Sequence, residues 1–280
     1  GEEGGGFVFV APVDPVTGSI RINFADQLPL TLPRLSDYGN GPEWGESRRG
    51  PEVFLTCQDT EVDSPALCRA ARSVDGTWGL TQLPDSLGYQ AKDPSRSPRT
   101  AVPMVHYEIL NRSGPKIYGW RPDIDDPVDL AIPTGLASGR WTSDGRRLLL
   151  TQFGRGAGRS IVALDAKSGT VVPLFDDDAD RSFPFPWAAP ELGGAEAFVV
   201  RTDAPEGFSE GIGIAVYRPK PNREPDDARY ELWTEIPPIC PDYPYTSSPE
   251  PFVVGDTSYL AMVSYTDGDK LEDPGVIWIA

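Results

Sequence analysis

Several residue types and patterns are scarce in this chain of 280 residues, and each scarcity excludes a class of function. A single histidine, His106, excludes His-rich zinc sites and allows a Ser-His-Asp hydrolase only through that one residue. No apolar run is long enough to span a bilayer, and no phosphate-binding glycine loop opens a helix. Basic residues number 25 against 42 acidic ones, so the net charge of −17 disfavours nucleic acids and anionic membranes as partners.

Helical patterns are also scarce. No stretch of about a dozen residues keeps an apolar stripe at the helical period without a glycine or proline. Short β-rich runs recur instead, and 30 prolines and 29 glycines favour many turns between them. The sequence therefore predicts an all-β fold. The predicted strands lie at residues 7–10, 19–24, 53–56, 106–110, 116–120, 147–152, 160–164, 170–174, 197–200, 212–217, 230–235, 259–265 and 276–279.

One repeat unit is clear in residues 141–175. Trp141 precedes the turn Thr-Ser-Asp-Gly-Arg and a strand, and a second strand, a Lys-Ser-Gly turn and a third strand follow. This unit resembles the repeat of TolB-like propellers, in which a Trp or Phe precedes a Ser-Pro-Asp-Gly-Lys turn. The resemblance covers one blade well and the others loosely. It implies a β-propeller, and TolB-like domains bind another protein.

Five segments share an opening that contains a proline or a matching Trp motif. Three carry Pro-Glu, with Glu43, Glu191 and Glu250, whereas Met104 follows the fourth proline and Arg140 takes the place of Glu in the fifth. Their separations range from the upper thirties to about sixty residues, so loop lengths vary around the roughly 40–50 residues of a typical blade. The sequence predicts one domain over residues 1–280, a five-bladed β-propeller closed by N-terminal strands that join the C-terminal blade. Residues 1–6 are expected to form a flexible leader.

The five openings also predict a site, because the innermost strand of each propeller blade lines the central channel. The three Pro-Glu blades are neighbours in a closed ring of five, so their carboxylates would converge. Clustered like charges raise some pKa values, which favours acid–base chemistry on a small molecule or glycan. The predicted catalytic residues are Glu43, Glu191 and Glu250, and the predicted ligand-binding residues are Arg140, Met104, His106, Trp44 and Trp141.

A second resemblance points to a reaction. Residues 248–260 are similar to part of the five-bladed glycosidases of the arabinanase and xylosidase type. That resemblance implies that Glu250 is a general acid in a carboxylate-dependent glycoside hydrolase. The first-blade Asp of those enzymes has no clean match, since Asp14 lies in a predicted outer turn, so Glu43 would have to act as the base.

The alternative is that each Pro-Glu belongs to the repeat itself. The Glu would then pair with an Arg or a backbone N–H of the next blade, and the protein would be a scaffold that binds another protein. A functional site predicts buried, unpaired carboxylates, whereas a scaffold predicts paired ones. No cofactor is predicted, although clustered carboxylates leave Ca²⁺ as an alternative. The acidic run at 176–180 is more typical of a solvated turn.

The three cysteines bear on the compartment. Cys57 and Cys68 flank a polar loop at 58–67, where they would form either a disulfide or two buried thiols, and Cys240 is left over. A disulfide implies an oxidising compartment. The sequence predicts a monomer that is secreted or periplasmic, with a lipid anchor on a removed N-terminal segment as one option.

Overall fold

A computed structural model of the chain divides into two compact units, unit 1 (Gly1–Ala137) and unit 2 (Ser138–Ala280), and each is described by itself. The structure describes residues 9–12, 14, 16–17, 19–28, 42–47, 50–59, 64–82, 90–96, 105–111, 114–121, 126–129, 132–154, 158–165, 167–175, 177, 179–203, 212–221, 229–237, 242–243, 245–266 and 276–279. Strands dominate both units, as the sequence predicts. Among the described residues, no helix is both long and apolar enough to cross a membrane.

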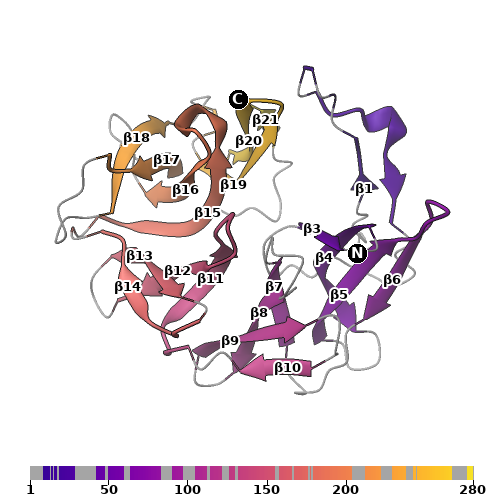
Figure 1. The fold of residues 1–280 in the computed structure, drawn as a ribbon, viewed down its shortest axis with the longest axis horizontal. Coiled ribbons are helices and arrows are strands. Elements are labelled where there is room, and N and C mark those ends of the chain that lie inside the picture. The colour runs from indigo at the N-terminus through magenta and orange to yellow at the C-terminus, as the bar shows by residue number, and fades with distance from the viewer. Residues whose placement is uncertain are drawn as a thin grey trace. The chain divides into compact units, whose positions relative to one another are not determined.

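Unit 1 contains two antiparallel four-stranded sheets and one two-stranded sheet (Figure 1). Each four-stranded sheet is a meander in which strands that follow one another in the sequence pair with one another. This is the strand arrangement of a propeller blade. The strands are β1 (Phe9–Val10) and β2 (Asp26–Gln27); β3 (Glu43–Ser47), β4 (Gly50–Asp59), β5 (Ser64–Arg72) and β6 (Trp78–Gln82); and β7 (Gln90–Arg96), β8 (Val105–Asn111), β9 (Gly114–Arg121) and β10 (Asp126–Asp129).

The N-terminal strands belong to unit 1. β1 pairs with β2, and a short 3₁₀ turn η1 (Ile22–Phe24) lies between them. Leu28 is fully buried with alternate residues of β4 and β5, and Val10 packs against the same cluster. Burial of this apolar surface attaches the N-terminal segment to the β3–β6 sheet. The predicted closure of the ring by these strands is not confirmed.

Unit 2 contains one four-stranded sheet and one seven-stranded sheet, so the residues that the structure describes form four blade sheets rather than the five predicted. The strands expected in the fourth and fifth blades are joined by a single parallel pair, Ile212 with Tyr245. The strands are β11 (Leu136–Trp141), β12 (Arg147–Phe153), β13 (Arg159–Asp165) and β14 (Val171–Pro173); then β15 (Arg181–Ala189), β16 (Ala195–Asp203), β17 (Ile212–Pro219), β18 (Tyr230–Ile236), β19 (Tyr245–Val254), β20 (Thr257–Tyr265) and β21 (Val276–Ile279).

Two predicted turns of the clear repeat unit are confirmed. Between β11 and β12, Gly145 adopts a φ of 62° and its N–H donates to the carbonyl of Thr142 (2.8 Å). Between β13 and β14, Gly169 adopts a φ of 71° and its N–H donates to the carbonyl of Asp165 (2.9 Å). Glycine suits both positions because it carries no Cβ to clash in the left-handed region.

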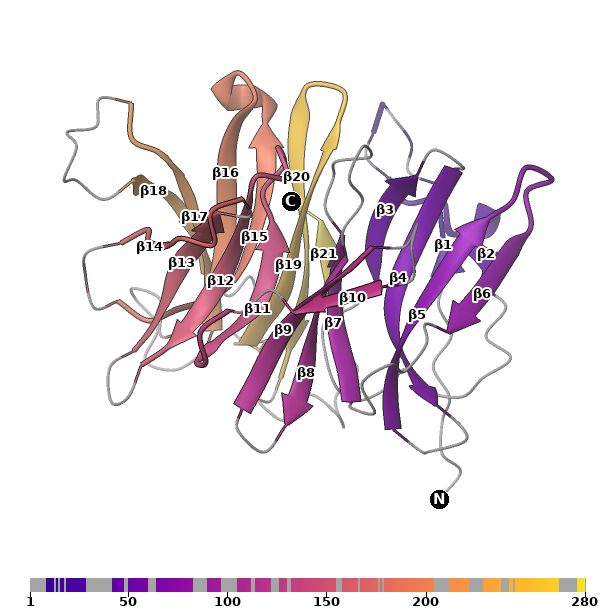
Figure 2. The same cartoon turned by 60° about the horizontal axis from the view of Figure 1, so that its bottom comes forward.

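Two apolar clusters hold unit 2 together. One contains Phe198, Tyr217 and Tyr230 with residues of β12 and β13, and the ring centroids of Phe198 and Tyr230 lie 4.7 Å apart. The other contains Phe185 of β15 and Met262 of β20. Figure 2 shows β15, β16 and β17 side by side. The first cluster joins β16 and β17 to β12 and β13, and the second joins β15, β16 and β17 to β20. β15 contacts β12 and β13, and β19 contacts β15 and β16. The first strands of the groups β15–β18 and β19–β21 therefore each pack against the group that precedes them in the sequence.

Candidate functional site

The three Pro-Glu sequences occupy different structural positions. Glu43 is the first residue of β3, whereas Glu250 lies inside β19 opposite Ala261. Glu191 lies beyond the end of β15, in the 3₁₀ turn η2 (Pro190–Leu192). Repetition in the sequence therefore does not place the three carboxylates at equivalent points of their sheets.

A different repeated feature occurs among the first strands of the blades. Three of them carry a register shift, or β-bulge, and each shift contains a proline: Pro94 in β7, Pro184 in β15 and Pro249 in β19. Proline has no N–H for the ladder, so it is tolerated where a bulge interrupts pairing. An X-Pro-X inside an otherwise β-rich run is the sequence signal for this position.

Backbone strain accompanies the first strands of unit 2. Phe183, next to Pro184, has a φ of 55°, and Ser138 of β11 has a φ of 54°. A bulky residue rarely adopts this conformation. The backbone N–H of Phe183 donates to the hydroxyl of Thr151 (3.0 Å). Strain of this kind marks positions that the surrounding structure over-determines.

Glu191 is bonded to the hairpin that joins β19 and β20. The backbone N–H of Ser258 donates to Oε1 of Glu191 (2.6 Å), and the Ser258 hydroxyl donates to Oε2 (2.7 Å). The indole N–H of Trp187 in turn donates to the Ser258 hydroxyl (3.0 Å). Ser258 thus connects the end of β15 to the next hairpin. This is the contact that the scaffold alternative expects of a Pro-Glu glutamate.

Glu196 makes a similar contact, but with a serine that lies earlier in the chain rather than later. Glu196 lies near the start of β16, and both of its oxygens accept from the backbone N–H of Ser143 (3.0 and 3.1 Å). The Ser143 hydroxyl also donates to Glu196. Ser143 belongs to the turn between β11 and β12. We call the contacts Glu191–Ser258 and Glu196–Ser143 the two carboxylate–serine ties.

The two ties differ in their electrostatics. The backbone N–H and then the hydroxyl of Ser258 lower the pKa of the exposed Glu191 carboxyl below its ordinary value. Burial raises the pKa of Glu196, and the negative charge of Asp144 adds to this, although the Ser143 donors oppose it. Hydrogen bonds dominate in the first case and desolvation in the second. Sequence reasoning did not identify Glu196, which follows no proline.

The remaining predicted site residues are spread over both units. Arg140 is buried in β11, its guanidinium lies 4.8 Å from the Phe185 ring centroid, and Nη1 donates to its neighbouring Gly139 carbonyl (2.9 Å). Trp141 is buried beside it, and Trp44 in β3 is 52% exposed. His106 lies on β8 but its side chain is outside the described residues, and Met104 is wholly outside them.

The structure places two predicted carboxylates in the same sheet. The carboxylate of Glu191 contacts Ser258, and Glu250 pairs with Ala261 three positions further along β20. Ser258 and Ala261 are an odd number of residues apart, so side chains at these two positions project from opposite faces of the sheet. Both oxygens of Glu191 are directed to Ser258 instead.

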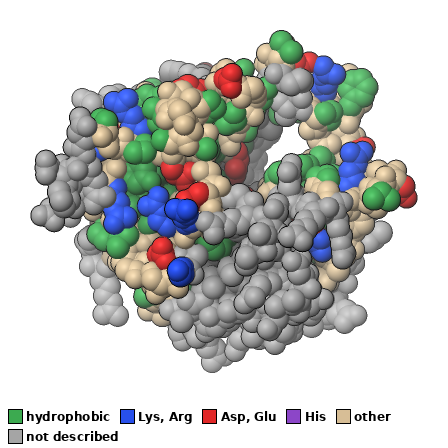
Figure 3. Space-filling view, in the orientation of Figure 1, with side chains coloured by type: hydrophobic (Ala, Val, Ile, Leu, Met, Phe, Trp, Pro, Cys, Tyr) green, Lys and Arg blue, Asp and Glu red, His purple; other side chains and the backbone are tan. Residues whose placement is uncertain are grey.

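No group of three or more His, Cys, Asp or Glu side chains suited to a metal occurs among the described residues. In the acidic run, Asp177 pairs with Arg181 and Asp180 pairs with Arg159. On the face seen in Figure 3, Lys and Arg side chains of unit 2 lie beside Asp and Glu side chains.

Comparison with solved structures identifies the fold. No known family matches the sequence, and no curated protein matches it. TolB from Acinetobacter baumannii superimposes with a TM-score of 0.60 at 16% identity over 98% of this chain, which spans 60% of that TolB chain. A putative TolB from Agrobacterium tumefaciens gives 0.50 at 15% identity over 76% of this chain and 74% of that one. The chain has the β-propeller fold.

The predicted resemblance to TolB-like propellers is thereby confirmed at the level of fold. An exo-1,5-alpha-L-arabinanase from a bovine ruminal metagenomic library gives a TM-score of 0.49 at 15% identity, over 91% of this chain and 99% of that one. At that score the likeness carries no argument for the reaction.

Proposed function

We propose that this chain is a non-catalytic β-propeller that binds another protein. The observation that supports the proposal best is the Glu191–Ser258 tie, since both oxygens of a predicted catalytic carboxylate accept from one serine. A general acid needs a raised pKa, and the pKa of Glu191 is lowered. The resemblance to TolB-like propellers favours a protein partner.

The proposal extends to compartment and assembly. Cys68 is disulfide-bonded, which supports an oxidising compartment such as the periplasm or the extracellular space. We further propose a monomer that folds as one domain, in which the N-terminal strands complete the last blade. Among the described strands β21 pairs with β20 alone, and an open edge of this kind favours the addition of a strand.

The competing function is a glycoside hydrolase that uses Glu43, Glu191 and Glu250 with Arg140. The two functions are separated by turnover of arabinan and xylan oligosaccharides, measured for the wild type and for the triple variant E43Q/E191Q/E250Q. We expect the wild type to release no more reducing sugar than the triple variant. Release by the wild type that falls at least a hundredfold in a folded triple variant would contradict the proposal, because loss of general acid–base catalysis costs about that much.

A further inference from the structure

Unit 1 contains a crevice of about 680 Å³ that takes no part in the proposed function. It is lined by the start of β4, by the end of β5, by β6 and by the hairpin at residues 73–77. Small-molecule sites in proteins commonly have volumes of about 300–1,000 Å³. A Cβ built on Gly79, in the lining, would meet nothing within 4 Å, so the space above this strand is open.

Among the residues that line the crevice, the exposed charged side chains are two arginines, and the Asp26 carboxylate lies beside one of them. The lining contains one acidic side chain, Glu52, which pairs with Arg69 and is 1% exposed. The side chains of Arg69 and Arg72 are 23% and 45% exposed. The crevice therefore offers guanidinium groups to a ligand, whereas the whole chain carries a net charge of −17. At physiological salt, charges beyond about 8 Å are largely screened, so the local groups dominate.

Arg69 also has donors to spare. A guanidinium carries five N–H donors, and among the described residues Arg69 bonds to Glu52 alone, through Nη2. Its Nε is buried without a hydrogen-bond partner in that part of the chain. Buried donors are nearly always satisfied in native proteins, by protein, water or ligand.

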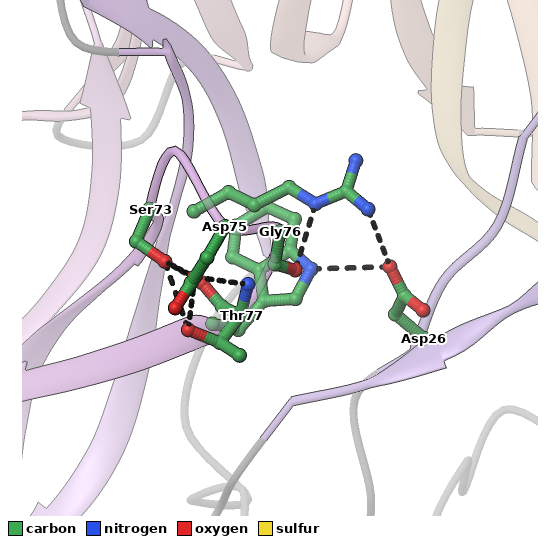
Figure 4. A network of polar contacts seen from close by, with 7 residues as sticks. Asp26, Ser73, Asp75, Gly76 and Thr77 are labelled. Atoms are coloured by element: carbon green, nitrogen blue, oxygen red, sulfur yellow. Dashed lines mark hydrogen bonds and ion pairs between the residues drawn. The ribbon is translucent and has the colours of Figure 1, made fainter.

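The neighbouring hairpin holds the second arginine in place (Figure 4). Arg72 donates from Nε to the carbonyl of Gly76 (3.1 Å), and its Nη2 lies 3.4 Å from Oδ2 of Asp26. The indole N–H of Trp78 donates to the same oxygen of Asp26 (3.4 Å). Hydrogen bonds from Ser73 and Thr77 hold the pKa of Asp75 at about 2, so Asp75 stays ionised and fixes the turn. The site is therefore organised before any ligand binds.

We propose that this crevice binds a small organic acid. Its carboxylate meets the guanidinium groups of Arg69 and Arg72, since paired N–H donors of arginine match the two oxygens of a carboxylate. Its apolar body lies against Trp78 and Leu80, which line the same crevice. Nothing in this site depends on whether the protein binds another protein.

The test follows the indole N–H resonance of Trp78 by NMR, assigned through Trp78→Phe. Phenylacetate, hexanoate and succinate are titrated against the full chain, and each is compared with its uncharged amide. We expect a saturable shift with at least one acid, and affinity at least tenfold weaker for the matching amide. Tenfold corresponds to about 1.4 kcal/mol, the range of a hydrogen bond to a charged group.

Variants separate the site from non-specific binding. Arg72→Gln removes an exposed guanidinium, and we expect it to weaken the acid about tenfold. Arg69→Gln alone would remove the positive charge beside the buried Glu52 carboxylate, so the double variant E52Q/R69Q replaces the ion pair with a neutral pair instead. Arg146→Gln, at an exposed arginine of unit 2, is the matched control. No saturable shift with any of the three acids, equal binding of acid and amide, or binding unchanged in both site variants overturns the proposal.

Discussion

At the scale of single residues, the cysteines show how far local sequence reasoning extends. Cys68 is disulfide-bonded, as one of the two sequence alternatives predicts. Leu55 of β4 pairs with Cys68 of β5, and Cys57 pairs with Ala66, so Cys57 lies two positions from Cys68 in the register of these strands. This register makes Cys57 the expected partner, although its side chain lies outside the described residues.

Thiol mapping tests that pairing. We predict that the unreduced, unfolded protein reacts with iodoacetamide at Cys240 alone, whereas the reduced protein reacts at all three cysteines. Peptide mass spectrometry identifies the modified residue. In the variant Cys57→Ser, Cys68 should become reactive. Modification of Cys57 in the unreduced wild type would show that the register argument is wrong.

At the scale of elements, turns were predictable and the two ties were not. The turn at residues 142–146 depends on a glycine with positive φ and on the side chain of Asp144, which accepts from the N–H of Arg146 (2.9 Å). Both signals are local in sequence. Each tie joins residues more than fifty positions apart, and no local pattern specifies such a pairing. Of the Pro-Glu glutamates, Glu191 has the backbone N–H partner that the scaffold alternative predicts.

The two ties should respond to pH with opposite signs. The lowered pKa of Glu191 means that its stabilising contribution is present above the ordinary value of 4.5 and is lost as the pH falls through the lower folded value. The raised pKa of Glu196 means that folding favours its protonated form, so its contribution improves as the pH falls from 7 towards 4.5.

Urea unfolding of Glu191→Gln and Glu196→Gln at pH 7 and pH 4.5 measures this difference. We expect the difference in unfolding free energy between the wild type and Glu191→Gln to shrink on acidification. The corresponding difference for Glu196→Gln should grow. Glu235→Gln, at an exposed position of β18 outside both ties, is the control for the Glu-to-Gln substitution itself. The same sign of change for both variants would contradict the assignment of the two environments.

At the scale of the whole molecule, composition predicted the all-β class and the repeat predicted the propeller. The blade count failed because it assumed that each opening starts a separate sheet. One pair, Ile212 with Tyr245, joins two expected blades, and such pairing depends on where β19 begins. The predicted catalytic cluster stays a prediction: Glu191 lies in the turn that follows β15, whereas Glu250 lies inside β19.

In the function that we propose, Glu191 is a structural cross-link rather than a catalytic acid. A double-mutant cycle with Glu191→Ala, Ser258→Ala and the double variant measures the coupling directly, by urea unfolding at pH 7. Coupled contacts give about 0.5–3 kcal/mol, and we predict a value in the lower half of that range because Glu191 is exposed. Two substitutions whose effects simply add would show that the tie contributes nothing, and would contradict the account.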